Sequence, residues 1–301
     1  MFSYRHAFHA GNHADVLKHA TLVAVLQHLT QKEGALSVVD THAGAGLYRL
    51  DTGGAATSGE ALEGIQKLLN HLNSDGTVTA TLPELLKNYL VMLAGFNQRN
   101  GGGKGIKLYP GSPLIAGHLL RQQDRVMAFE VHPTDHRALR TTLAQATSDA
   151  KLQMDRRNGF EGVIPLLPPV SRRGLVICDP SYELKTDYAD GVKLMGESLT
   201  RFATGSVLIW CPIVGRSEAH DLPRKLKNAA DKAGKDWLHA TLQVRAGSSG
   251  QGPGGGLGAS GVFVLNPPYT LKPQLEEALP VLVKLLGQDK HAAQKLESKI
   301  R

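Results

Sequence analysis

Two short segments of this chain combine a side chain that accepts hydrogen bonds with proline and an aromatic ring. The first, "DPSY", spans Asp179 to Tyr182, and the second, "NPPY", spans Asn266 to Tyr269. These residue types suit chemistry at an exocyclic amine, because the side-chain oxygen and the first proline's carbonyl can accept both amine hydrogens. The acceptors stabilise the positive charge that develops on the nitrogen as it attacks a methyl donor. The aromatic ring can stack on a nucleobase.

The DPSY segment departs from the complete pattern at one position. Ser181 stands where a second proline would stiffen the turn. Both acceptors remain, the side chain of Asp179 and the carbonyl of Pro180, and so does the ring of Tyr182. The chemistry of the segment is therefore expected to survive this difference.

The position of each segment in the fold decides between them. In a doubly wound sheet, ligands bind at the carboxyl ends of the parallel strands. The apolar run 174–178 is expected to be such a strand, and it ends at Asp179. The run 261–265 is expected to form an antiparallel hairpin with 237–245, so its end lies at the opposite edge. We therefore predict that Asp179 is the catalytic acceptor and that Asn266–Tyr269 only terminates a strand.

A glycine-containing loop near the N-terminus is typical of nucleoside binding. Residues 38–46, "VVDTHAGAG", place an acid and Gly-x-Gly after an apolar strand. A dinucleotide fingerprint would need a third glycine where Arg49 stands. The pattern instead fits a loop under S-adenosylmethionine, with Asp40 and His42 near its methionine end. An ordinary strand-to-helix turn remains the alternative.

Two later segments fit the same ligand. Glu130, at the end of the run 124–131, is placed to accept hydrogen bonds from ribose hydroxyls, although it could instead cap a helix. Asn158 and Gly159 form a turn after the run 151–155 and are expected beside the adenine ring. An Asn-Gly turn alone is weak support, because such turns are common.

Strand-like and helical patterns alternate along the chain, which predicts an α/β fold with helices on both faces of a mostly parallel sheet. The segment 14–31 has helical spacing, with Asp15 favourably placed near its start. Seven strands are predicted, at 35–40, 124–131, 151–155, 174–179, 205–212, 237–245 and 261–266.

A helical insertion explains the long interval between the first two strands. We predict an insertion subdomain at 55–108, which contains the helical pattern 83–98, within a main domain of residues 1–54 and 109–301. The glycine-rich stretch 246–261 lacks the Gly-Lys-Ser/Thr of a phosphate loop. We expect it to be a flexible hairpin connection, with an RNA-contacting loop as the alternative.

Composition sets broad limits. The net charge of +7 favours an anionic partner such as nucleic acid, but charge alone leaves the question open. Two cysteines exclude a disulfide framework and indicate the reducing cytoplasm. No apolar stretch reaches the roughly 18 residues of a membrane helix, and the N-terminal histidines lack a metal-binding pattern. No membrane or metal is expected, and without a heptad pattern a monomer is favoured.

A thiolate nucleophile, as used in pyrimidine C5 methylation, is the less favoured chemistry. Cys178 precedes Asp179 in a strand, so its side chain should point away from the site. Cys211 lies near the end of the fifth predicted strand, before Pro212.

Four segments together resemble a known family. The segments 4–19, 40–46, 109–116 and 168–183 are similar to the J-type 23S ribosomal RNA adenine-N6 methyltransferases, and the resemblance covers essentially the whole chain. It implies a class I, Rossmann-like methyltransferase fold of seven strands with a small helical insertion. It also implies S-adenosylmethionine as donor and one adenine of 23S ribosomal RNA, position 2030, as target.

The resemblance assigns roles to matching positions. It makes Asp179 the catalytic acceptor and a cofactor contact, and it implies RNA contact by Tyr4, with His6 and Lys18 of the same segment as helpers. The DPSY motif itself predicts Pro180 and Tyr182 as substrate contacts. The further cofactor contacts that it implies are His19, His42, Ser112, Glu130, Asn158 and Gly159.

Two departures from the family are evident. Ser181 replaces the family's second proline, and Asn158 stands where many members have Asp. A DNA adenine methyltransferase is the alternative with the same chemistry, although no helix-turn-helix is recognisable. A non-catalytic RNA-binding protein with this fold is the third possibility, and only Ser181 favours it.

Overall fold

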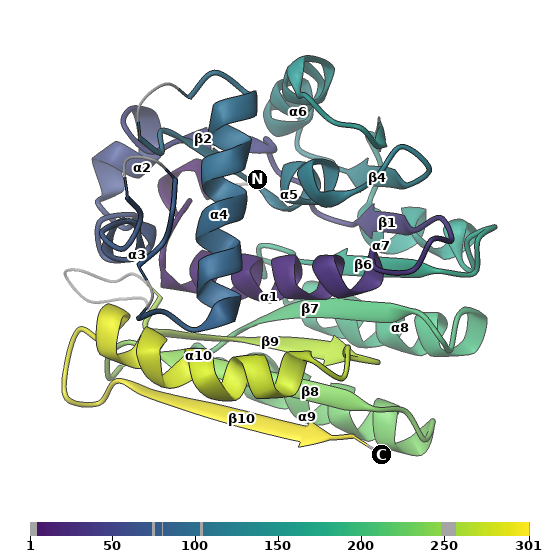
Figure 1. The fold of residues 1–301 in the computed structure, drawn as a ribbon. Coiled ribbons are helices and arrows are strands. Elements are labelled where there is room, and N and C mark those ends of the chain that lie inside the picture. The colour runs from purple at the N-terminus through teal and green to yellow at the C-terminus, as the bar shows by residue number, and fades with distance from the viewer. Residues whose placement is uncertain (1–4, 74–75, 80, 103–104, 248–256, 301) are drawn as a thin grey trace.

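The computed structural model describes residues 5–73, 76–79, 81–102, 105–247 and 257–300 (Figure 1). Its centre is one eight-stranded sheet in the order β10-β8-β9-β7-β6-β1-β4-β5. The strands are β1 (Ser37–Asp40), β4 (Arg125–Phe129), β5 (Lys151–Asp155), β6 (Gly174–Cys178), β7 (Ser206–Pro212), β8 (Trp237–Gln243), β9 (Ala259–Leu265) and β10 (Ala293–Lys299).

The predicted α/β class and all seven predicted strands are confirmed. Strand β1 pairs in parallel with β4 and β6, whereas β9 runs antiparallel to β7 and β8, as expected. After β1, the chain adds β4 and β5 on one side of that strand. It then crosses back and forms β6 on the other side of β1. This reversal creates a crevice at the carboxyl ends of β1 and β6, where ligands bind in such sheets.

The eighth strand, β10, was not predicted. It pairs antiparallel with β8 at the edge of the sheet. Its sequence, "AQKLESK", is mostly polar, and most of its side chains are exposed or half-buried. An edge strand of this kind lacks the apolar run that identified the other strands.

Helices cover both faces of the sheet (Figure 1). Side chains alternate along the strands, so Val38 and Val39 belong to separate apolar clusters on opposite faces. One face carries α1 (His13–Leu29), α4 (Glu84–Arg99), α5 (Ser112–Leu119), α6 (Pro133–Gln145) and α10 (Leu271–Leu286). The other carries α7 (Gly159–Gly162), η2 (Ile164–Leu166), α8 (Lys185–Arg201) and α9 (Ser217–Lys232).

Helix α1 is buried along most of its length. The Asn12 side chain caps its N-terminus by accepting hydrogen bonds from the backbone N–H groups of Ala14 and Asp15. The helix lies between the sheet and α4, α5 and α10. Packing on all sides explains why even its polar residues Asp15 and Lys18 are buried.

The segment 55–108 is helical in part. Strands β2 (Leu47–Arg49) and β3 (Leu108–Pro110), at the two ends of this segment in the sequence, pair with each other. The segment contains α3 (Ile65–Leu69) and α4. Helix α2 (Gly53–Ser58) and the short helix η1 (His6–Phe8) pack together beside it. The apolar side chains of α4 belong to the same cluster as α1 and the sheet.

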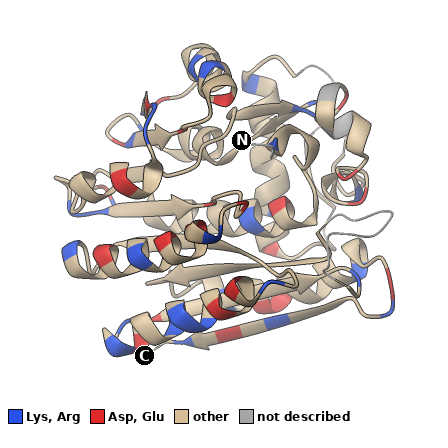
Figure 2. Cartoon of the chain, turned by 180° about the vertical axis from the view of Figure 1, so that it is seen from behind, with Lys and Arg blue, Asp and Glu red and all other residues tan. Residues whose placement is uncertain are grey.

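Charged side chains are spread over the surface. Figure 2 shows basic and acidic residues interspersed along the helices of the face opposite to that in Figure 1, and both kinds occur within α8 and α9. No helix among the described residues is long and apolar enough to cross a membrane.

Candidate active site

The carboxyl ends of the parallel strands open onto one cavity of about 570 Å³. The structure brings together most of the predicted site residues around it, although they come from distant parts of the sequence. The predicted residues that line it are His6, Lys18, His19, His42, Ser112, Glu130, Asn158, Gly159, Asp179 and Pro180. Tyr4 lies outside the described residues.

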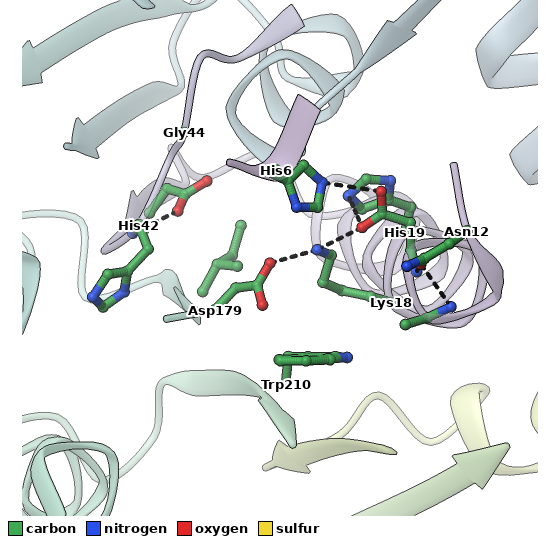
Figure 3. Close-up of polar contacts among 12 residues, drawn as sticks. His6, Asn12, Lys18, His19, His42, Gly44, Asp179 and Trp210 are labelled. Atoms are coloured by element: carbon green, nitrogen blue, oxygen red, sulfur yellow. Dashed lines mark hydrogen bonds and ion pairs between the residues drawn. The ribbon is translucent and has the colours of Figure 1, made fainter. Parts of the chain in front are cut away.

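Asp179 follows β6 and is held by an ion pair. The Lys18 ammonium group donates a hydrogen bond to Asp179 Oδ2, and it also lies 2.8 Å from Asp15 Oδ1 (Figure 3). The Lys18 side chain is only 5% exposed. Among the described residues, no hydrogen bond is recorded to Asp179 Oδ1, which leaves this oxygen available to accept one.

Asp15 is the centre of this network. Besides Lys18, its carboxylate accepts a hydrogen bond from the backbone N–H of Gly11 at 2.9 Å and contacts His6 Nε2 at 3.1 Å. Burial alone would raise the pKa of Asp15, but His6, Lys18 and His19 hold this pKa well below its usual range. Burial would likewise lower the pKa of Lys18, but Asp15 and Asp179 outweigh it and raise this pKa. The two buried groups Asp15 and Lys18 therefore remain charged at neutral pH.

His19 links the cavity to α4. Its Nδ1 lies 3.0 Å from the Tyr109 hydroxyl, which lies 2.8 Å from the hydroxyl of Tyr89 on α4. Burial lowers the pKa of His19 to about 3, so the ring is neutral. A neutral ring in this position can orient a ligand but adds no positive charge beside Lys18.

Glu130 joins two loops at the edge of the cavity. Its Oε2 accepts a hydrogen bond from Gly44 N–H at 2.8 Å, and its Oε1 accepts one from His132 N–H at 2.7 Å. His132 is the N-cap residue of α6, so Glu130 supports the start of a helix and also lines the cavity. Burial raises the pKa of Glu130. Each oxygen keeps a further lone pair for a ligand hydroxyl.

The residues around the cavity fit a bound nucleoside. A Cβ atom on Gly159 would lie 1.9 Å from the backbone oxygen of Thr41, so only glycine permits this close approach of two loops. Asn158 caps α7 by accepting a hydrogen bond from Phe160 N–H at 2.9 Å. The ring of His42 lies edge-on to that of Phe160. Burial lowers the pKa of His42 to about 3. Flat rings suit the adenine of a bound S-adenosylmethionine. The polar acceptors beside them suit its hydroxyl and amino groups.

The structure contradicts the predicted placement of one residue. Tyr182 was expected to stack on the target base, but its side chain is 4% exposed and does not line the cavity. Its hydroxyl donates a hydrogen bond to the Trp210 carbonyl at 2.7 Å, and its ring lies 4.6 Å from that of Tyr188. The left-handed backbone of Tyr182, with φ +54°, turns the ring into the apolar layer beneath the site.

Cys178 is placed as predicted, with its thiol buried among apolar side chains on the face away from the cavity. Burial raises the pKa of the Cys178 thiol well above its usual value. Cys211 lies in the same cluster, and burial raises its pKa to about 12. Both thiols therefore stay protonated and out of reach of a ligand.

The NPPY segment lies at the opposite end of the sheet, where the parallel strands begin. Asn266 follows β9, which ends beside the start of β7. Its amide group donates hydrogen bonds to the carbonyls of Ala203, at 3.1 Å, and Gly205, at 2.7 Å. Both amide hydrogens are thereby used in holding a turn, and neither Asn266 nor Tyr269 lines the cavity. This placement agrees with a strand terminator.

Sequence reasoning missed two residues of the site region. Asp15 was considered only as a helix-starting residue, although Asp15, Lys18 and His19 share one helix face at spacings of three and four residues. That spacing is the signal that could have identified the network. Trp210, on β7, contacts the ring of Tyr182, which follows Asp179 and Pro180 in the chain. No sequence motif marks it.

Comparison with known proteins agrees with this geometry. The family described as "Ribosomal RNA large subunit methyltransferase D, RlmJ" matches residues 33–297. The chain is 42% identical to ribosomal RNA large subunit methyltransferase J of Haemophilus influenzae over 95% of this chain and 94% of the relative. It is 39% identical to the protein of the same name from Escherichia coli, over 94% and 93%.

A solved structure also covers nearly the whole fold. Protein LPL1258 of Legionella pneumophila is 30% identical, with a TM-score of 0.81 over 96% of this chain and 98% of that chain. The match therefore includes most of the segment 55–108 as well as the sheet. The chain belongs to the ribosomal RNA large subunit methyltransferase J family.

Proposed function

We propose that this protein transfers a methyl group from S-adenosylmethionine to N6 of one adenine in 23S ribosomal RNA. The observation that carries the proposal is the position of Asp179, a carboxylate at the carboxyl end of β6 in the same cavity as Glu130 and Gly159. Relatives named as ribosomal RNA large subunit methyltransferases support RNA as the substrate. The family resemblance supports the adenine at position 2030.

The acceptors at the site fit the amine of adenine. In the proposed reaction, Asp179 Oδ1 accepts one hydrogen of the amine and the carbonyl of Pro180 accepts the other. Lys18 holds Asp179 Oδ2, which fixes the direction of the free oxygen. S-adenosylmethionine supplies a methyl group on a positively charged sulfur. The protein's task is to align the adenine nitrogen with this group and to stabilise the charge that passes to the nitrogen.

Further residues hold the two reactants. Glu130 would accept hydrogen bonds from the ribose of the donor, and Asn158 and Gly159 would lie beside its adenine. His19, His42 and Ser112 would surround its amino acid part. Among substrate contacts, His6, Lys18 and Pro180 border the cavity. The target base must leave its stack to enter, which costs least in unpaired RNA.

A DNA adenine methyltransferase would use the same acceptors, so the substrate needs a direct test. Labelled S-adenosylmethionine is incubated with protein-free 23S ribosomal RNA and, separately, with duplex DNA, and each product is digested to nucleosides. We expect label only in N6-methyladenosine from RNA. Label from DNA alone would contradict the proposal, and label in another nucleoside would contradict the role of Asp179.

A further inference from the structure

A second hollow lies at the opposite edge of the sheet, where the parallel strands begin. Its volume is about 270 Å³. Four of its lining residues are basic or histidine, and none is acidic. The lining residues are His28, Leu29, Lys32, Leu36, Arg172, Arg173, Gly174, Thr204 and Ser206.

Lys32 and Arg172 provide uncompensated positive charge at this hollow. Both side chains are exposed, and no ion pair or side-chain hydrogen bond is recorded for either within the described part of the chain. Arg172 has a left-handed backbone, with φ +51°, which is uncommon for arginine and frequent at functional positions. The hollow therefore attracts an anion without a protein partner to neutralise it.

Arg173 fixes the backbone at one side of the hollow. Its guanidinium group donates hydrogen bonds to the carbonyls of Leu29, the last residue of α1, and of Lys32 and Gly34 in the loop that follows. Arg121 donates to the same loop, to the carbonyls of Thr30 and Lys32. The backbone that carries Lys32 is therefore fixed.

The NPPY segment, which the proposed active site does not use, stands beside this hollow. The Ser206 hydroxyl lines the hollow and donates a hydrogen bond to the Asn266 carbonyl at 3.0 Å. The Tyr269 side chain is 76% exposed, and its ring packs edge-on against His28, another lining residue, at 5.2 Å. An exposed aromatic ring is thus held next to a basic hollow.

We propose that this basic hollow and Tyr269 form a second RNA-contacting surface, where Lys32 and Arg172 bind backbone phosphate and Tyr269 stacks on an unpaired base. Basic side chains beside an exposed ring are the combination that binds single-stranded RNA. The inference rests on the proposed function, because it extends the RNA contact to the opposite edge. Strands of four to seven residues separate the two ends of the sheet by roughly 13 to 23 Å, at about 3.3 Å per residue. A folded RNA can span this distance.

The test uses Lys32→Glu, Arg172→Glu and Tyr269→Ala in the full chain. KM and kcat for methyl transfer are measured on a long 23S RNA fragment and on the shortest stem-loop that contains the target adenine. We expect each variant to raise KM for the long fragment about tenfold, because one charged contact or one stacked base is lost, while kcat stays unchanged. On the stem-loop, KM should not change.

The matched control is Lys232→Glu, a charge reversal at an exposed lysine of α9. It should leave KM for the long fragment near the wild-type value. Unchanged KM in all three variants, or an equal rise on the stem-loop, would overturn the inference and leave the proposed function standing. If the unaltered protein transfers no methyl group to RNA, the proposed function fails instead. A filter-binding assay with the long fragment then still tests the surface directly.

Discussion

Asp179 depends on a partner that its own motif does not contain. The sequence identified Asp179 from the residues next to it and from the expected direction of its strand. It could not show that Lys18 and Asp15, on α1, hold the carboxylate from across the cavity. It also misplaced Tyr182, because the φ of +54° that buries the ring follows from the turn and not from the residue type.

The buried Asp15 is expected to matter for stability and activity together. In Asp15→Asn, Lys18 loses one of its two carboxylate partners while remaining buried. We expect the free energy of unfolding to fall by about 3 kcal/mol, as for other broken buried ion pairs, and methyl transfer to fall with it. Urea unfolding and the transfer assay measure the two effects. The control Asp221→Asn breaks a surface pair with Arg224 and should change neither. Equal behaviour of the two variants would contradict the role of Asp15.

Asp40 gives the cofactor-free protein a characteristic pH dependence. Burial raises the pKa of its carboxyl from 3.8 to about 6. The folded protein therefore binds this proton more tightly than the unfolded chain does. Stability that is present below about pH 4 is lost as the pH rises to about 6, by roughly 3 kcal/mol. Asp40→Asn should remove this loss, so the variant should match the wild type at pH 4 and exceed it at pH 7 in denaturant unfolding. A parallel pH profile in the two proteins would rule the effect out.

At the scale of elements, the apolar runs predicted the seven strands, because buried strands leave a clear pattern. The polar edge strand β10 left none. The pattern also could not show that α4 shares a core with α1, because helical spacing of apolar residues does not identify the surface against which a helix packs. The turn at Asn158 and Gly159 was predicted, but its close contact with the loop after β1 was not.

The close contact between Gly159 and the loop after β1 leads to a prediction. In Gly159→Ala, the added methyl group would overlap the Thr41 carbonyl, so the loops must separate. We expect a loss of about 1 to 3 kcal/mol in stability and at least tenfold weaker binding of S-adenosylmethionine, measured by calorimetry. Gly196→Ala in α8 is the matched control, because a Cβ there meets nothing within 4 Å. It should bind normally and gain about 0.5 to 1 kcal/mol. Normal binding by Gly159→Ala would contradict the assigned position.

For the whole molecule, topology separates two similar segments. DPSY and NPPY each follow a strand, but the strands run in opposite directions, so the segments lie at opposite edges of the sheet. The net charge is +7, and the charged side chains are spread widely over the surface. Ion pairs determine which basic side chains are available to bind an anion. Composition therefore favoured an anionic partner without identifying it, and it could not show the surfaces that meet it.

The two ligands should respond differently to salt. RNA binding releases counterions from phosphates, so raising the salt from about 50 to 200 mM should weaken it tenfold or more. Binding of S-adenosylmethionine, which has no phosphate group, should change little. Filter binding for RNA and calorimetry for the cofactor provide the comparison. RNA affinity that does not depend on salt would contradict a phosphate-based contact.

The most direct test compares the two segments in one assay. Asp179→Ala and Asn266→Gly are assayed for transfer of labelled methyl to 23S ribosomal RNA, per folded molecule. Glycine tolerates the φ of +46° at position 266, so this variant removes the amide with little backbone strain. We predict that Asp179→Ala loses about 100- to 1,000-fold in rate, while Asn266→Gly keeps kcat. Full activity of Asp179→Ala, or loss of kcat in Asn266→Gly alone, would place the chemistry at the other edge of the sheet.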